Sequence, residues 1–199
     1  MISAHIILIF LWILFCALHS VFASEKWKKR MQDAMQNRYK FYRMCYSVFA
    51  MITLSIVVVY NFRLQSLMIW NVGIIEKILA ITAMGLFGFI MVLFSRRFFF
   101  DLSGADVFKK QPVSRQLIKT DLYKYVRHPL YSATLGFIWS IFFYRPLLSN
   151  LISCLCITIY TVIGIYFEEK KLMIEFGESY LNYRLKTPML IPKWFFKKI

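Results

Sequence analysis

The amino-acid sequence predicts an all-α integral membrane protein with five transmembrane helices, its amino terminus outside and its carboxyl terminus in the cytoplasm. Composition is the first reason: of 199 residues, 59% are hydrophobic and 18% are charged, whereas a soluble domain carries about 25% charged residues. The second reason is a series of five long apolar runs. The third is the placement of lysine and arginine, which are concentrated between alternate runs.

The five runs are expected to be the membrane helices because a spanning helix needs about 20 apolar residues. The fourth run has about 16 residues and barely crosses a core of about 30 Å, so we expect it to start among the headgroups or to pack against protein. No lysine or arginine precedes the first run, so it is expected to be a retained helix and not a signal peptide. The runs are Ser3–Ala23, Met44–Phe62, Gly73–Ser95, Pro129–Tyr144 and Leu147–Phe167.

The basic residues predict the orientation. Segments 24–43, 96–128 and 169–199 contain seven, eight and seven of the 25 lysines and arginines. The positive-inside rule therefore places these three segments in the cytoplasm. We interpret the net charge of +15 as a topology signal and as contact with anionic membrane lipids, not as nucleic-acid binding.

The cysteines predict no further site, and the sequence contains no common nucleotide-binding motif. The four cysteines fall in or beside the apolar runs and are expected to be packing residues, so neither a disulfide framework nor a metal site is predicted. The sequence contains neither GxGxxG nor GxxxxGK[ST], so a nucleotide would have to be bound by another design.

The stretch "YKYVRHPLYSA", residues 123–133, is the first candidate site. Pro129 suits the first turn of a helix, which places His128 at the helix start. Free backbone N–H groups and the positive end of the helix dipole gather there and attract a carboxylate. Tyr131 lies within one turn. The alternative is that Arg127 is a topology signal and the tyrosines form an interfacial aromatic belt.

The second candidate site is "FEEKK", where Glu168 and Glu169 directly follow the fifth run. Ionisable groups at a membrane boundary favour a functional interpretation. Neighbouring helical residues point in different directions, so one acid can turn inward while the other stays in water. The alternative is pairing with nearby bases, such as Lys171 three residues after Glu168.

A hairpin through "YRPLLSN" connects the fourth and fifth runs, so the two candidate sites are expected to converge at one depth. Such a mixed site suits a cationic ligand that also carries a carboxylate. After the acids, a helix is expected to break at Gly177 and to resume over "ESYLNYRLK". Pro188 and Pro192 favour extended backbone beyond it.

The order and spacing of "YKYVRHPLYSA", the apolar hairpin and "FEEKKLMIEFGESYLNYRLKTPMLIP" resemble the integral-membrane S-adenosylmethionine-dependent methyltransferases. That family includes isoprenylcysteine carboxyl methyltransferases, phospholipid N-methyltransferases and bacterial methanethiol S-methyltransferases. The resemblance extends from Thr120 to Pro192. The stretches "LHSVFASEKWKKR", "YKFYRMCYSVFAMITL" and "FDLSGADVF" look more like the methanethiol methyltransferase branch.

The resemblance implies transfer of a methyl group from S-adenosylmethionine to a small thiol or other lipophilic acceptor, in a bacterial cytoplasmic membrane with the active site facing the cytoplasm. Residues 1–199 would form a single membrane domain, with a three-helix part over 1–95 and a cofactor-binding methyltransferase core over 96–199. The cofactor site would be formed by the fourth and fifth helices, the preceding loop and the tail. Its implied residues are Arg127, His128, Pro129, Tyr131, Glu168 and Glu169.

The catalytic residue stays unassigned, with Lys186 and Glu168 as candidates. In the isoprenylcysteine branch, an arginine near the final proline turn helps to place the substrate. Here Met189 follows Pro188, and Lys186 is the nearest base. This departure favours an apolar or thiol acceptor over a carboxylate.

Three other functions stay open. One alternative is methylation of a prenylated or lipid-like acceptor, and another is a non-catalytic membrane partner that retains the fold. A small-solute transporter is disfavoured because no inverted repeat is visible and only Glu76, near an end, places an acid in a run.

Overall fold

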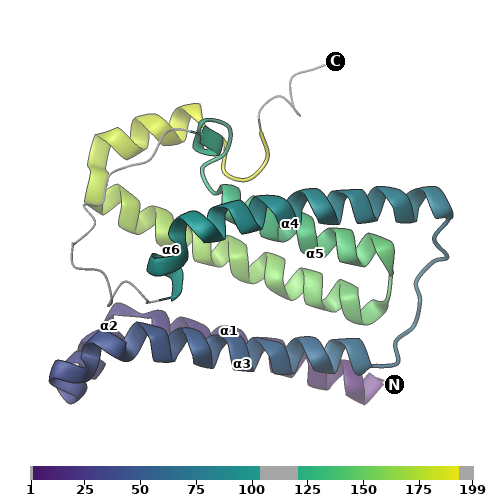
Figure 1. Ribbon diagram of the computed structural model, residues 1–199, viewed down its shortest axis with the longest axis horizontal. Helices are drawn as coiled ribbons and strands as arrows, with labels where there is room; N and C mark the ends of the chain where they lie inside the picture. The colour runs from purple at the N-terminus through teal and green to yellow at the C-terminus, as the bar shows by residue number, and fades with distance from the viewer. Residues whose placement is uncertain (1, 104–120, 193–199) are drawn as a thin grey trace.

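The computed structural model describes residues 2–103 and 121–192, and every long element in these two ranges is an α-helix (Figure 1). Short 3-10 helices at Gln36–Phe41 and Asp121–Lys124 connect some of them. The α-helices are α1 (Ile2–Ala23), α2 (Glu25–Met35), α3 (Tyr42–Arg63), α4 (Ile74–Ser103), α5 (Pro129–Tyr144) and α6 (Leu148–Lys186).

The all-helical prediction is confirmed over the described residues, and four helical stretches are long and apolar enough to cross a membrane. They are α1, the continuous stretch Glu25–Arg63 that ends in α3, the Ile74–Arg96 part of α4, and α6. Helix α5 has 16 residues and is therefore about 24 Å long, which is less than a core of about 30 Å. A fifth span and the orientation of the chain thus stay predictions.

The long helices lie side by side in two groups (Figure 1). Helices α1 and α3 form one group, and α4, α5 and α6 form the other. The amino terminus, the α3–α4 connection and the α5–α6 turn lie at one end of the bundle. The other end holds α2, the start of α5 and the later part of α6. We call it the carboxylate end because Glu168 and Glu169 lie there.

The two groups are joined by α6, which packs against α1 through both apolar and polar contacts. Ile152 and Ile157 of α6 pack against the buried Leu8 and Trp12 of α1. The Trp12 indole Nε1 donates to the Ser153 hydroxyl at 2.8 Å. Because lipid offers no partner for a polar group, such cross-helix hydrogen bonds hold membrane helices in register.

Helices α4 and α5 approach each other closely at Gly136. A Cβ atom added there would lie 2.6 Å from ring carbons of Phe87 on α4. We expect Gly136→Ala to lower the free energy of unfolding by about 1–3 kcal/mol, because the Phe87 ring must shift to make room. The midpoint of thermal unfolding in detergent measures this effect.

Gly164→Ala is the matched control, since a Cβ atom on this α6 glycine meets nothing within 4 Å. Alanine is also the better helix former, so this variant should be at least as stable as the parent. Equal midpoints for Gly136→Ala and the parent would contradict the close approach of α4 and α5.

Candidate active site

Helix α5 begins as predicted, with Pro129 at its first turn and His128 as the N-cap residue. The two backbone N–H groups just before the helix are occupied by the tail. The Arg127 N–H donates to the Pro188 carbonyl at 2.9 Å, and the His128 N–H donates to the Met189 carbonyl at 3.1 Å. A carboxylate ligand can therefore meet only the first turn of α5 itself.

The tail after α6 thus lies across the start of α5. Thr187 is extended, with φ −115° and ψ 128°, and the Ser132 hydroxyl of α5 donates to the Leu190 carbonyl at 2.7 Å. The tail holds this end of α5 through carbonyl groups, so these contacts depend little on which side chains the tail carries.

The direction of the tail is set by a kink in α6. Gly177 has φ 51° and ψ −129°, a backbone conformation available mainly to glycine, and the predicted break is confirmed. After the kink, the helix turns back over the bundle (Figure 1). In a straight helix, Arg184 would lie about 22 Å from Glu169, but their Nε and Oε2 atoms are 3.4 Å apart.

Glu169 is the centre of the resulting network. Its side chain is 8% exposed, and its Oε1 accepts from Arg127 Nε at 2.8 Å and lies 3.2 Å from His128 Nε2. The Arg127 guanidinium also donates to the carbonyls of Arg184 and Thr187. The start of α5, the end of the apolar part of α6 and the tail therefore meet at one place, as the hairpin predicts.

Burial opposes the ionisation of Glu169, but hydrogen bonds and charge from Arg127 and His128 outweigh it and lower the pKa of this carboxyl below its ordinary 4.5. Glu169 is therefore ionised at neutral pH. Because the folded pKa is lowered, the ion pair stabilises the fold above the ordinary pKa, and this contribution is lost as the pH falls through the folded value.

Glu168 differs from its neighbour, as predicted: its side chain is 43% exposed. Even so, its Oε2 is buried and makes no hydrogen bond to any described residue, and His128 Nδ1 lies 3.9 Å away. Lys171 pairs with Glu25 of α2 at 3.3 Å, so the alternative pairing of Lys171 with Glu168 is not formed.

Tyr180 also has a buried polar atom that lacks a hydrogen-bond partner among the described residues. It is 1% exposed, and within the described part of the chain its hydroxyl has no hydrogen-bond partner within 3.5 Å, although it interacts with the Glu169 carboxylate. Burial and the nearby Glu169 carboxylate raise the pKa of the Tyr180 phenol, so it keeps its proton and is a donor. Buried polar atoms are rarely left unsatisfied. An acceptor on Glu168 and a donor on Tyr180 are thus available to a ligand.

The other predicted residues are placed as follows. The Tyr131 ring lies 5.7 Å from the His128 ring, so the structure brings these two predicted residues together. Lys186 is exposed in the last turn of α6 and forms no ion pair among the residues described, so its catalytic role stays a prediction. The loop before α5 was expected to contribute, but residues 104–120, with most of "FDLSGADVF", lie outside the described ranges.

Sequence reasoning missed Arg184 and Tyr180. Both follow the Gly177 kink, and their contacts with Glu169 depend on the direction in which the helix turns back. The glycine in "FGESYLNYR" signals the break, but it does not reveal which face of the second half points inward.

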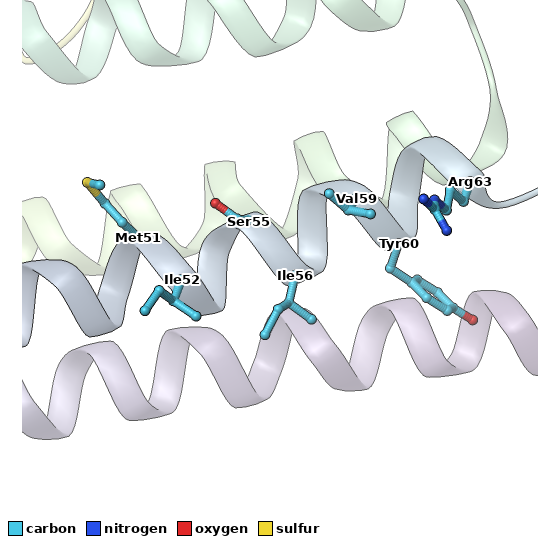
Figure 2. Close-up of a pocket in the computed structure, with 7 residues that line it drawn as sticks. All are labelled: Met51, Ile52, Ser55, Ile56, Val59, Tyr60 and Arg63. Atoms are coloured by element: carbon cyan, nitrogen blue, oxygen red, sulfur yellow. The ribbon is translucent and has the colours of Figure 1, made fainter.

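Two surface hollows lie away from this network. One is a groove of about 610 Å³ along α3, lined mainly by apolar residues from Met51 to Arg63. Figure 2 shows its side chains, with Tyr60 pointing toward α1, where its hydroxyl donates to the Ala4 carbonyl at 3.1 Å. The other hollow, of about 470 Å³, includes Lys77 and Arg145 at the opposite end of the bundle. Neither contains residues of the Glu169 network.

Known proteins resemble the chain over most of its length. A family model described as "NnrU protein" matches residues 7–187. Methanethiol S-methyltransferase 1 of Bradyrhizobium diazoefficiens is 29% identical over 96% of this chain and 67% of its own length. Methanethiol S-methyltransferase of Crocosphaera subtropica is 30% identical over 90% of this chain and 71% of its own length. Methanethiol S-methyltransferase 2 of the Bradyrhizobium strain is 38% identical over 50% of this chain and 39% of its own length.

No solved structure matches the chain. The family match extends over nearly all of the described residues, including both halves of the Glu169 network. The predicted resemblance to the membrane methyltransferases is therefore confirmed, and the chain belongs to the NnrU protein family as a relative of the methanethiol S-methyltransferases.

Proposed function

We propose that the protein transfers a methyl group from S-adenosylmethionine to a small thiol acceptor at a bacterial cytoplasmic membrane, with its active site facing the cytoplasm. The observation that carries the proposal is the network at the carboxylate end. Arg127 and His128 are held on the buried Glu169, while Glu168 and Tyr180 keep buried polar atoms unsatisfied. The names of the relatives support a thiol acceptor.

The residues present fit S-adenosylmethionine, which carries an ammonium group, a carboxylate and a sulfonium. Glu168 is the acceptor for the ammonium group, since its Oε2 makes no hydrogen bond to a described residue. Tyr180 is a donor for a polar group of the ligand. His128 and Tyr131 line the site with their rings, while Arg127 and Pro129 shape the backbone around it. Glu169 holds Arg127 and His128 in place.

When bound, the cofactor supplies an electrophilic methyl group, so the protein needs mainly to orient an acceptor in line with it. The buried network around Glu169 restrains the side chains that orient the acceptor. A polar cofactor enters from the side of the charged residues, whereas a small apolar thiol partitions into lipid and reaches the site laterally. The four apolar helical stretches are suited to this second route.

The test combines binding with turnover. S-adenosylmethionine is titrated into the detergent-purified protein, and transfer of its labelled methyl group is followed with methanethiol, with a prenylated cysteine and with a phospholipid amine. We expect saturable binding, and transfer to methanethiol well above transfer to the other two. Labelling of the prenylated or lipid acceptor alone would reassign the substrate. Absence of cofactor binding would favour a non-catalytic membrane partner.

A further inference from the structure

A cluster of hydrogen-bonding side chains lies within the helical bundle on the apolar side of Glu168. His19 of α1 is half-buried, and the hydroxyl of Tyr46 on α3 lies 2.9 Å from its Nδ1 and 3.0 Å from its Nε2. Tyr160 of α6 approaches edge-on, with the ring centres 6.1 Å apart. The Tyr160 hydroxyl is 3.1 Å from the Ser20 hydroxyl. Three helices therefore place polar groups around one imidazole.

Tyr160 of this cluster lies on the same helix as Glu168 of the proposed cofactor site. Tyr131 of α5 lies within electrostatic reach of both Glu168 and Tyr160. Tyr160 and Glu168 are eight residues apart on α6, which separates them by about 80° around the helix and about 12 Å along its axis. The Tyr160 ring that His19 approaches thus belongs to a position about two helical turns deeper in the bundle than Glu168.

A structural role for His19 is the simpler explanation, because the hydrogen bond with Tyr46 joins α1 to α3. His5, at the other end of α1, has a role of that kind, with its Nε2 2.9 Å from the Ser66 hydroxyl. His19 differs because it also faces the Tyr160 ring of α6. A proton-accepting group within an apolar segment commonly marks a functional site.

We propose that His19 is the general base for a small thiol acceptor, bound between His19 and Tyr131 with Tyr160 beside it. This inference rests on the proposed methyl transfer. As the acceptor's S–H bond breaks, the proton passes to the His19 imidazole. The acceptor sulfur forms a bond to the methyl carbon, the donor's sulfur–methyl bond breaks, and that electron pair stays on the donor sulfur. Tyr46 is a positioning residue that orients the imidazole.

The site suits a small, neutral thiol. Among the described residues, the titratable groups around His19 are the Tyr46 and Tyr160 phenols that contact it, with Tyr42 beside Tyr46 and the Cys16 and Cys156 thiols beside Tyr160. All of them are neutral at neutral pH. A charged acceptor would find no counter-ion among them, whereas a neutral thiol needs only a base.

His19→Asn tests this role, because asparagine retains a hydrogen bond to Tyr46 but accepts no proton. At neutral pH we expect kcat/KM for methanethiol to fall about 100-fold, with the Kd for S-adenosylmethionine unchanged. The deficit should shrink as the pH rises, because the free thiol ionises without a base. His5→Asn is the matched control, about 21 Å away along α1, and should behave as the parent does.

A second measurement does not depend on turnover. The chain has three histidines, so ¹³C-labelled imidazoles give three NMR signals that His→Asn variants assign. Dimethyl sulfide, the expected product, should shift the His19 signal and leave the His5 signal in place. A shift confined to His128 would overturn the assignment, as would a His19→Asn variant that is fully active or that loses cofactor binding. A parent without methyl transfer would instead disprove the proposed function, whatever the NMR result for the acceptor site.

Discussion

Glu169→Gln is expected to lower the free energy of unfolding by about 3 kcal/mol and to remove S-adenosylmethionine binding. The substitution preserves shape but leaves the Arg127 guanidinium, which is 9% exposed, without its counter-ion, and breaking one partner of a buried ion pair costs about 3–5 kcal/mol. His128 and Arg184 lose the same carboxylate. Thermal unfolding in detergent and cofactor titration measure the two effects.

The control is Glu175→Gln, because Glu175 is an exposed acid on the same helix. It should leave both measurements unchanged. The parent should also lose stability as the pH falls below about 4.5, since Glu169 must then be protonated against its lowered pKa. This loss should be smaller in Glu169→Gln. If Glu169→Gln unfolds at the parent's temperature and with the parent's pH dependence, Glu169 does not hold this end of the bundle together.

Glu168→Gln is expected to weaken S-adenosylmethionine binding about 10–100-fold while leaving the thermal midpoint near that of the parent. Its Oε2 has no hydrogen bond to a described residue to lose, and the side chain is 43% exposed, so the fold does not depend on its charge. A hydrogen bond to a charged group is worth about 1.5–3 kcal/mol, which corresponds to this loss of affinity for a cationic ligand.

Glu178→Gln serves as the comparison, since Glu178 is exposed on the same helix after the kink. Isothermal titration with each purified variant gives the affinities directly. The contrast between the two neighbours is the decisive result: Glu169→Gln should fail in stability and in binding, whereas Glu168→Gln should fail in binding alone. Parent-like affinity in Glu168→Gln would exclude Glu168 from the cofactor site.

Local chemistry made much of the fold predictable. Four of the five apolar runs coincide with helices long enough to span a membrane, because a backbone in lipid must satisfy its hydrogen bonds internally. Proline has a restricted φ and no N–H, which is why the start of α5 at Pro129 could be read from the chain. Glycine tolerates conformations closed to other residues, which is why the break at Gly177 could be read as well.

The candidate site was predictable in part. Two helices joined by a short turn lie antiparallel, so the hairpin alone predicted that His128 and the acid pair would lie at the same end of the bundle. That one acid turns inward followed from helical geometry. The sequence did not predict which of the two acids turns inward. Glu169 does so because it pairs with Arg127, which lies 42 residues earlier in the chain.

The sequence by itself thus determined the helices, their ends and the two motifs of the site, because these features depend on short-range backbone and hydrophobic constraints. Only the tertiary structure decided that Arg184 and Tyr180 join Glu169, that the tail occupies the N–H groups of Arg127 and His128, and that His19 faces Tyr160. These contacts depend on the direction of the Gly177 kink and on the rotation of each helix about its axis. Both are set by packing between segments far apart in the chain.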